Sequence, residues 1–109
     1  MEGEAQVTTS SNGSLSVRSD ALTTGTVLHL AGELDLATAP QLDAALSSSK
    51  AEHIVLDLSE LSFIDSSGIS LLVVALGEDR PVTLRNPQPI VSKVLELTGL
   101  DHLVEQPAS

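Results

Sequence analysis

Four consecutive residues, Asp65, Ser66, Ser67 and Gly68, have the clearest potential for chemistry in this chain. They follow an apolar run, 53–58, whose length and β-branched content are typical of a buried strand. The residues after them have the spacing of one helix face: Ile69, Leu72, Val73 and Leu76. A serine at such a junction presents its hydroxyl at the positive end of a helix, within reach of a partner. The stretch therefore predicts a modification site, and capping of the helix is the alternative explanation.

Phosphorylation is the modification that best suits Ser66. A phosphate there would add about −1.5 to −2 charge and could accept hydrogen bonds from backbone N–H groups at the helix start. A neutral or acidic partner surface docked on this loop would then face an uncompensated dianion. We expect phosphorylation to switch a protein–protein contact and to leave the fold unchanged.

Catalytic and metal sites are poorly supported by the histidines. His29, His53 and His102 occur in no recognisable metal-ligand spacing. A triad of Ser66, His53 and Asp35 can be written down, but the Gly-x-Ser-x-Gly pattern of hydrolases is absent. A hydrolase is therefore a minor alternative.

Cofactor binding is equally unsupported. The chain has no glycine-rich phosphate loop, and it contains no cysteine. The acid pairs Glu33 with Asp35, and Glu78 with Asp79, fall in predicted loops, where solvated acids are the common explanation. We expect no enzyme activity, no metal and no cofactor.

Composition restricts the partners further. The chain has 109 residues, five Lys and Arg residues, a formal charge of −10 and one aromatic residue, Phe63. Nucleic acid and anionic membranes are disfavoured, because both need clustered basic residues. No apolar run approaches the ~18 residues of a transmembrane helix, and the N-terminus lacks the features of a secretory signal. We expect a single cytoplasmic domain with an aliphatic core that binds basic surfaces on other proteins.

The first half of the chain alternates polar and apolar segments. Residues 1–13 predict a flexible tail, 14–18 and 27–31 a hairpin of two strands, and 32–35 a loop. Thr38 is a plausible N-cap for a helix with Pro40 in its first turn.

The second half predicts a strand at 53–58, a helix reaching about residue 76, a turn at 77–81 and a strand at 82–85. Asn86 and Pro87 indicate the start of the next helix, and Gly99 its left-handed C-terminal cap. An edge strand at 102–104 precedes a frayed end, 106–109. The order ββαβαβαβ predicts an α/β domain over 14–105, with a small mixed sheet and helices packed mainly on one face.

The helix after Gly68 is apolar on more than one side, since Leu71, Val74 and Ala75 add to its regular face. It is either buried on several sides or meets a partner with its outer face.

Five motifs, taken together, resemble the STAS domain of bacterial anti-sigma-factor antagonists. They occur in the family's order across about residues 14–105: Gly-Glu-Leu-Asp at 32–35, Ala-Pro at 39–40, Val-Leu-Asp-Leu at 55–58, Phe-Ile-Asp-Ser-Ser-Gly at 63–68 and Leu-Glu-Leu-Thr-Gly-Leu at 95–100. The family fold agrees with the predicted order of elements.

The resemblance implies partner switching. The unphosphorylated antagonist binds an anti-sigma factor that is also a serine kinase, and so frees the sigma factor. The kinase ends the contact by phosphorylating a serine, and a PP2C-type phosphatase restores it. The family's acceptor matches Ser66, with Ser67 as the less favoured choice. The partner-binding residues that we expect are Glu33, Asp35, Asp65, Ser67, Gly68, Ile69 and Leu71.

The chain also departs from the family pattern. Gly68-Ile69-Ser70 replaces the usual Gly-Leu-Gly, the connection from this helix to the next strand is shorter, and a C-terminal helix is missing or cut short. An accessory STAS module in a transporter or signalling complex, not regulated by phosphorylation, is therefore the alternative function. The sequence leaves the oligomeric state open.

Overall fold

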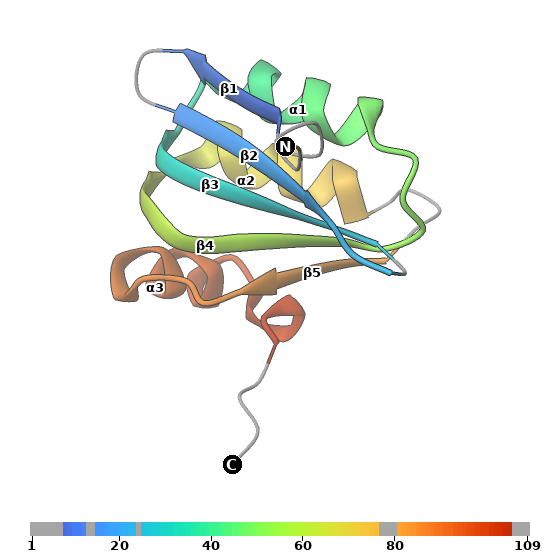
Figure 1. Cartoon of the computed structure of the whole chain (residues 1–109). Coiled ribbons are helices and arrows are strands. Elements are labelled where there is room, and N and C mark those ends of the chain that lie inside the picture. The colour runs from blue at the N-terminus through green and yellow to red at the C-terminus, as the bar shows by residue number, and fades with distance from the viewer. Residues whose placement is uncertain (1–7, 13–14, 24, 77–80, 106–109) are drawn as a thin grey trace.

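A five-stranded mixed sheet forms the centre of the protein, as seen in a computed structural model that describes residues 8–12, 15–23, 25–76 and 81–105. The strands lie in chain order, β1-β2-β3-β4-β5 (Figure 1). The pairs β1/β2 and β2/β3 are antiparallel, and β3/β4 and β4/β5 are parallel. The strands are β1 (Thr8–Asn12), β2 (Leu15–Ala21), β3 (Thr26–Leu34), β4 (Ile54–Ile64) and β5 (Val82–Arg85). The predicted α/β domain with a mixed sheet is confirmed.

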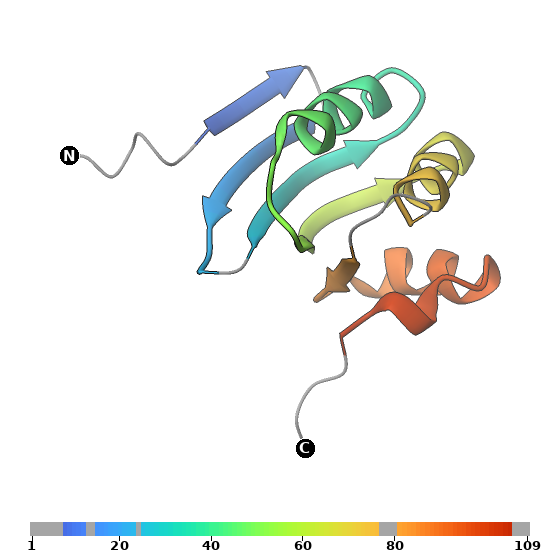
Figure 2. The same ribbon diagram turned by 90° about the vertical axis from the view of Figure 1, so that its right-hand side faces the viewer.

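The helices α1 (Ala39–Ser48) and α2 (Ser66–Leu76) lie side by side against one face of the sheet, as predicted (Figures 1 and 2). Helix α3 (Pro89–Leu97) lies at the β5 end of the sheet, beside β4. In the described residues no helix is both long and apolar enough to cross a membrane.

The core is aliphatic, as the composition predicted. Leu28, Leu30 and Leu34 of β3 face the helices and are buried. Leu42 of α1 and Leu72 of α2 close the core from the other side. The one aromatic residue, Phe63, is 43% exposed and takes no part in it.

The N-terminal segment differs from the prediction. Residues 8–12 are not a tail but form strand β1, which pairs with β2 from Thr8 opposite Ser19 to Asn12 opposite Leu15. The pairing uses backbone groups, so a polar segment can join a sheet without an apolar pattern. Residues 1–7 and 13 of the predicted tail lie outside the described residues.

The start of α3 was predicted wrongly. The helix begins at Pro89 with Gln88 in the N-cap position, not at Asn86 and Pro87. Asn86 has a φ of 56°, in the left-handed region, so the chain turns once more before the helix.

The C-terminal end of α3 was predicted correctly. Gly99 has a φ of 78°, and its N–H donates to the Glu96 carbonyl while that of Leu100 donates to the Leu95 carbonyl. These are the two hydrogen bonds of a Schellman motif.

No full strand follows α3 within the described residues. The 3₁₀ helix η2 (Asp101–Leu103) replaces the predicted edge strand, and only Val104 makes a single parallel bridge, to Leu84. The described order is therefore βββαβαβα. The predicted frayed end, 106–109, and most of the predicted turn, 77–80, lie outside the described residues.

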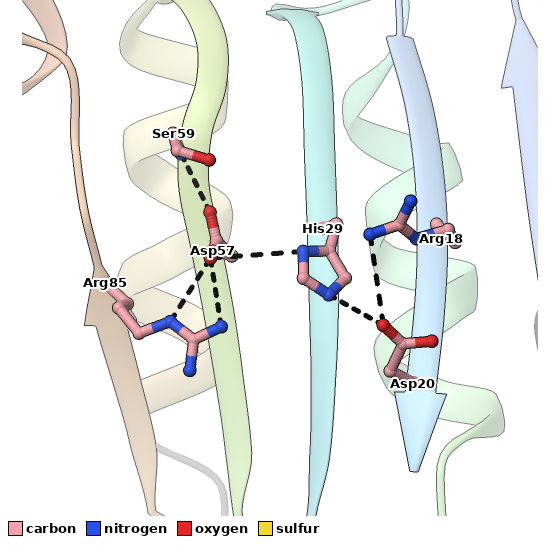
Figure 3. Close-up of polar contacts among 6 residues, drawn as sticks. All are labelled: Arg18, Asp20, His29, Asp57, Ser59 and Arg85. Atoms are coloured by element: carbon pink, nitrogen blue, oxygen red, sulfur yellow. Dashed lines mark hydrogen bonds and ion pairs between the residues drawn. The ribbon is translucent and has the colours of Figure 1, made fainter.

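The sheet face away from α1 and α2 carries a row of polar side chains that crosses β2 to β5 (Figure 3). His29 lies 3.0 Å from Asp20 and 3.9 Å from Asp57, and Arg85 pairs with Asp57 at 3.0 Å. Asp57 is buried. Burial raises the pKa of Asp57, but the hydrogen bonds from Ser59 and Arg85 and the charge of Arg85 outweigh burial and hold the pKa below its ordinary value.

Candidate phosphorylation and docking site

The predicted site lies where two neighbouring parallel strands end. Strands β3 and β4 run further than predicted, to Leu34 and Ile64, and these two residues are register partners. The N–H of Asp65 donates to the Leu34 carbonyl at 3.1 Å, which ties the two chain segments together just past the strands. The segment after β3, starting at Asp35, therefore runs beside the start of α2.

Asp65 is the N-cap of α2. Its Oδ1 accepts hydrogen bonds from the backbone N–H groups of Ser67 at 2.8 Å and Gly68 at 3.1 Å. Its carbonyl accepts the N–H of Ile69 at 3.0 Å. Ser66 is the first residue of the helix and its side chain is exposed. The geometry that the sequence predicted for Ser66 is thus present, and the capping role belongs to Asp65.

The same contacts change one expectation for a phosphate on Ser66. The N–H groups of Ser67 and Gly68 are the donors that such a phosphate was expected to use, and both already donate to Asp65. A phosphate would have to compete with that carboxylate or lie beside it. Repulsion by Asp65 would then offset the attraction of the helix N-terminus for the phosphate.

Gly68 holds the first turn of α2 close to the ends of both strands. A Cβ atom at this position would lie 2.8 Å from Cγ1 of Ile64 and 2.9 Å from Cγ of Leu34. Gly68 is buried, so it is a packing residue and offers a partner little surface. The helix start that carries Ser66 is fixed against the sheet by this contact.

The loop after β3 is closed by Thr38, which is buried. The Oγ1 of Thr38 accepts from the N–H of Asp35 at 2.9 Å and donates to the carbonyl of Glu33 at 2.9 Å. Thr38 occupies the predicted N-cap position of α1 but makes no side-chain cap hydrogen bond. Its hydroxyl instead shapes the loop, which leaves Glu33 exposed and Asp35 half-buried beside the start of α2.

Ile69 and Leu71, predicted to bind a partner, are half-buried and pack against the core. Among the residues of α2 whose burial the structure describes, 66–75, the exposed large apolar side chains are those of Val73 and Val74, at 52% and 61%.

Two more exposed apolar residues near the site, Leu36 at 75% and Phe63 at 43%, were not predicted to bind a partner. Leu36 follows Asp35 directly, and Phe63 is the register partner of Glu33. In the sequence, Leu36 directly follows Asp35, and Phe63 lies two residues before Asp65. This closeness of a large apolar residue to an acidic site residue is the signal that would have identified Leu36 and Phe63.

No group of three or more His, Asp or Glu side chains within the described residues could hold a metal ion. The site thus consists of one exposed hydroxyl, three carboxylates and a few exposed apolar side chains.

The comparison with known proteins agrees with this arrangement. A family model described as "Mlab, STAS domain" matches residues 17–105. The chain belongs to the STAS domain family. An anti-sigma F factor antagonist of Paenibacillus polymyxa is 36% identical to this STAS domain over 84 residues, which cover 68% of this chain and 70% of that protein.

Solved structures of STAS proteins have the same architecture. A crystal structure of an anti-sigma factor antagonist from Mycobacterium paratuberculosis has a TM-score of 0.76 and 25% identity, and covers 90% of this chain and 91% of that chain. The anti-sigma factor antagonist SpoIIAA in its unphosphorylated form has a TM-score of 0.72 and 28% identity, covering 85% of this chain and 89% of that one. The Bacillus SpoIIAA in its phosphorylated form gives 0.67 and 27%, covering 85% and 92%.

Proposed function

We propose that this STAS domain is an anti-sigma-factor antagonist whose contact with the anti-sigma factor is controlled by phosphorylation of Ser66. The observation that carries the proposal is the position of Ser66. Its exposed side chain starts α2, directly after the capping carboxylate of Asp65 and beside the loop that holds Glu33 and Asp35. The likeness to SpoIIAA, which has been solved with and without phosphate, supports the same role.

In the unphosphorylated state, the acidic edge formed by Glu33, Asp35 and Asp65 attracts a basic patch on the anti-sigma factor. The exposed side chains of Leu36 and Phe63 supply apolar contact area next to it. Binding of the antagonist withdraws the anti-sigma factor from the sigma factor, which is then free.

Phosphorylation by the anti-sigma factor, acting as a serine kinase, adds about −1.5 to −2 charge beside Asp65. The partner surface that covers Ser66 itself is neutral or acidic, so the added dianion is not compensated there, and the phosphate also occupies the contact surface. The complex separates, and a PP2C-type phosphatase resets the switch. The antagonist itself catalyses nothing and works in the cytoplasm.

The test uses the purified domain, its cognate anti-sigma kinase and ATP, with the phosphosite located by mass spectrometry. We expect one phosphate on wild-type protein and on Ser67→Ala, and none on Ser66→Ala. Ser66→Ala should bind the anti-sigma factor like wild type, and Ser66→Asp at least about tenfold more weakly. Equal binding of the two variants together with an unmodified Ser66 would refute the proposal.

The second candidate is an accessory STAS module that binds a constant partner. The exposed Val73 and Val74 on α2 favour it, because contiguous exposed apolar surface marks interaction sites. A co-purifying partner whose affinity is unchanged by Ser66→Asp and falls with Val74→Asp would support this function.

A further inference from the structure

Strand β4 carries two extra residues relative to its neighbour β3. His29 pairs with Asp57, but Ala31 pairs with Glu60, so one residue of β3 faces two of β4. A second shift follows, because Gly32 pairs with Leu61 and Glu33 with Phe63, which leaves Ser62 without a register partner. These are β-bulges, which bend a strand and increase its twist.

The bulges keep the core in register. The leucines of β3 on the helix face, Leu28, Leu30 and Leu34, are spaced by even numbers of residues. Strand β4 instead buries every third residue in its second half, at Leu58, Leu61 and Ile64. Each pair of facing residues therefore still points to the same side. The effect of the two extra residues is on the course of the strand, which bends toward α2 at its carboxyl end (Figure 1).

The second bulge is held by a side chain. The hydroxyl of Ser62 donates to the carbonyl of Gly32 at 3.0 Å. Gly32 itself has a φ of 111°, a conformation that side-chain-bearing residues rarely adopt. The bent part of β4 and Gly32 of β3 are thus in contact just before the two segments of the site. One segment carries Ser66, and the other carries Glu33.

We infer that Ser62 is a positioning residue for Ser66, and this inference rests on the proposed function of Ser66. Because Ser62 is the extra residue of the second bulge, it determines the direction in which β4 leads into Asp65 and Ser66. Through the bond to Gly32 it fixes that direction relative to Glu33 and Asp35. The docking surface has two parts: Glu33 and Asp35 at the end of β3, and Asp65 and Ser66 after β4. The contact between Ser62 and Gly32 holds these two parts in a fixed relative position.

Three variants test the inference: deletion of Ser62, Ser62→Ala and Ser62→Thr, with the exposed Ser47→Ala on α1 as the matched control. The deletion leaves Leu61 and Ile64 in their core positions, so the chain keeps its core pattern but loses the bulge. One readout is the backbone amide NMR spectrum of residues 33–35 and 65–69, which needs no partner. The other is the rate of Ser66 phosphorylation by the anti-sigma kinase.

We expect the deletion to shift the amide resonances of residues 65–69 and to slow phosphorylation about tenfold to a hundredfold, because the hydroxyl is misplaced. Ser62→Ala should slow it about two- to tenfold, as the loss of one hydrogen bond implies. Ser62→Thr should restore the wild-type rate, and Ser47→Ala should not change it.

A folded deletion variant with unchanged resonances at 65–69 would overturn the inference. If the deletion variant does not fold, equal behaviour of Ser62→Ala and wild type in both readouts would overturn it. If wild-type Ser66 is not phosphorylated at all, the proposed function fails while the NMR comparison still decides whether Ser62 positions the loop.

Discussion

Asp57 and Arg85 form an ion pair with 3.0 Å between Oδ2 and Nη2, and this pair joins β4 to β5 on the sheet face away from α1 and α2. The Asp57 side chain is 8% exposed, and its other oxygen accepts the N–H of Ser59 at 2.9 Å. That N–H belongs to the first bulge of β4. The Asp57 carboxylate therefore stabilises both the contact between β4 and β5 and the first bulge of β4.

The first prediction concerns the charge of Asp57. Asp57→Asn keeps the shape and removes the charge, so we expect the free energy of unfolding to fall by about 1–3 kcal/mol near pH 7. Urea denaturation of the variant and wild type measures the change. Asp43→Asn, an exposed position on α1, is the control and should stay within about 0.5 kcal/mol.

The difference in unfolding free energy between wild type and Asp57→Asn should also depend on pH. The pKa of Asp57 is lowered in the folded state, so the charged side chain contributes its full stability above its pKa in the unfolded chain. That contribution is lost as the pH falls through the lower pKa of the folded state. The stability difference between wild type and Asp57→Asn should therefore shrink in acid, and a difference that stays constant from pH 7 to pH 3 would contradict the assignment.

The second prediction concerns the cap of α2. Asp65→Ala leaves the N–H groups of Ser67 and Gly68 without their acceptor, and should cost about 0.5–2 kcal/mol of unfolding free energy. Asp65→Asn keeps an acceptor oxygen and should lose only a few tenths. Thermal and urea unfolding of both variants would show whether the loss follows the hydrogen bonds or the charge.

The third prediction concerns Gly68. Alanine usually favours a helix over glycine, but here the added methyl group would press on Ile64 and Leu34. We expect Gly68→Ala to destabilise the domain by about 1–3 kcal/mol. Ser70→Ala, in the same helix and exposed, should be neutral or slightly stabilising. A stabilised Gly68→Ala variant would show that the strand ends yield to the methyl group.

The fourth prediction separates the phosphate switch from a change of fold. A negative charge at Ser66 is favoured by the helix dipole and opposed by Asp65, so the two effects largely cancel. Ser66→Asp should change the unfolding free energy by less than about 1 kcal/mol, and its amide spectrum should change only around residues 65–69. A loss of dispersed signals throughout the spectrum would mean that the switch acts by unfolding.

The sequence predicted those features that depend on local chemistry. The helix start at residues 65–68 and the left-handed Gly99 were recognised because a helix start and a C-terminal glycine depend only on their own neighbours in the chain. The central run of β4 was recognised because it is buried on both faces and is therefore apolar apart from Asp57.

Features that depend on pairing were missed. The second half of β4 has its buried residues three apart, at Leu58, Leu61 and Ile64, because it contains two bulges relative to β3. Such a spacing matches neither a regular strand nor a helix, so the predicted strand ended at residue 58. The segment 8–12 was missed because it is held by backbone hydrogen bonds to β2 and has no apolar alternation of its own.

The site was predicted in the same uneven way. Ser66 and its flanking residues follow from the chain, whereas the exposure of Leu36 and Phe63 depends on how two strand ends and α2 pack together. Ile69 and Leu71 were predicted to bind a partner, and the structure packs part of both against the core.

The strand order has a consequence for biosynthesis. Each strand of the described sheet lies next to the strand that precedes it in the chain. As the polypeptide leaves the ribosome, every new strand meets a neighbour that is already made, and no earlier segment has to wait for a distant one. All residues of the proposed Ser66 site have been synthesised once α2 is complete, before β5 adds the last strand of the described sheet.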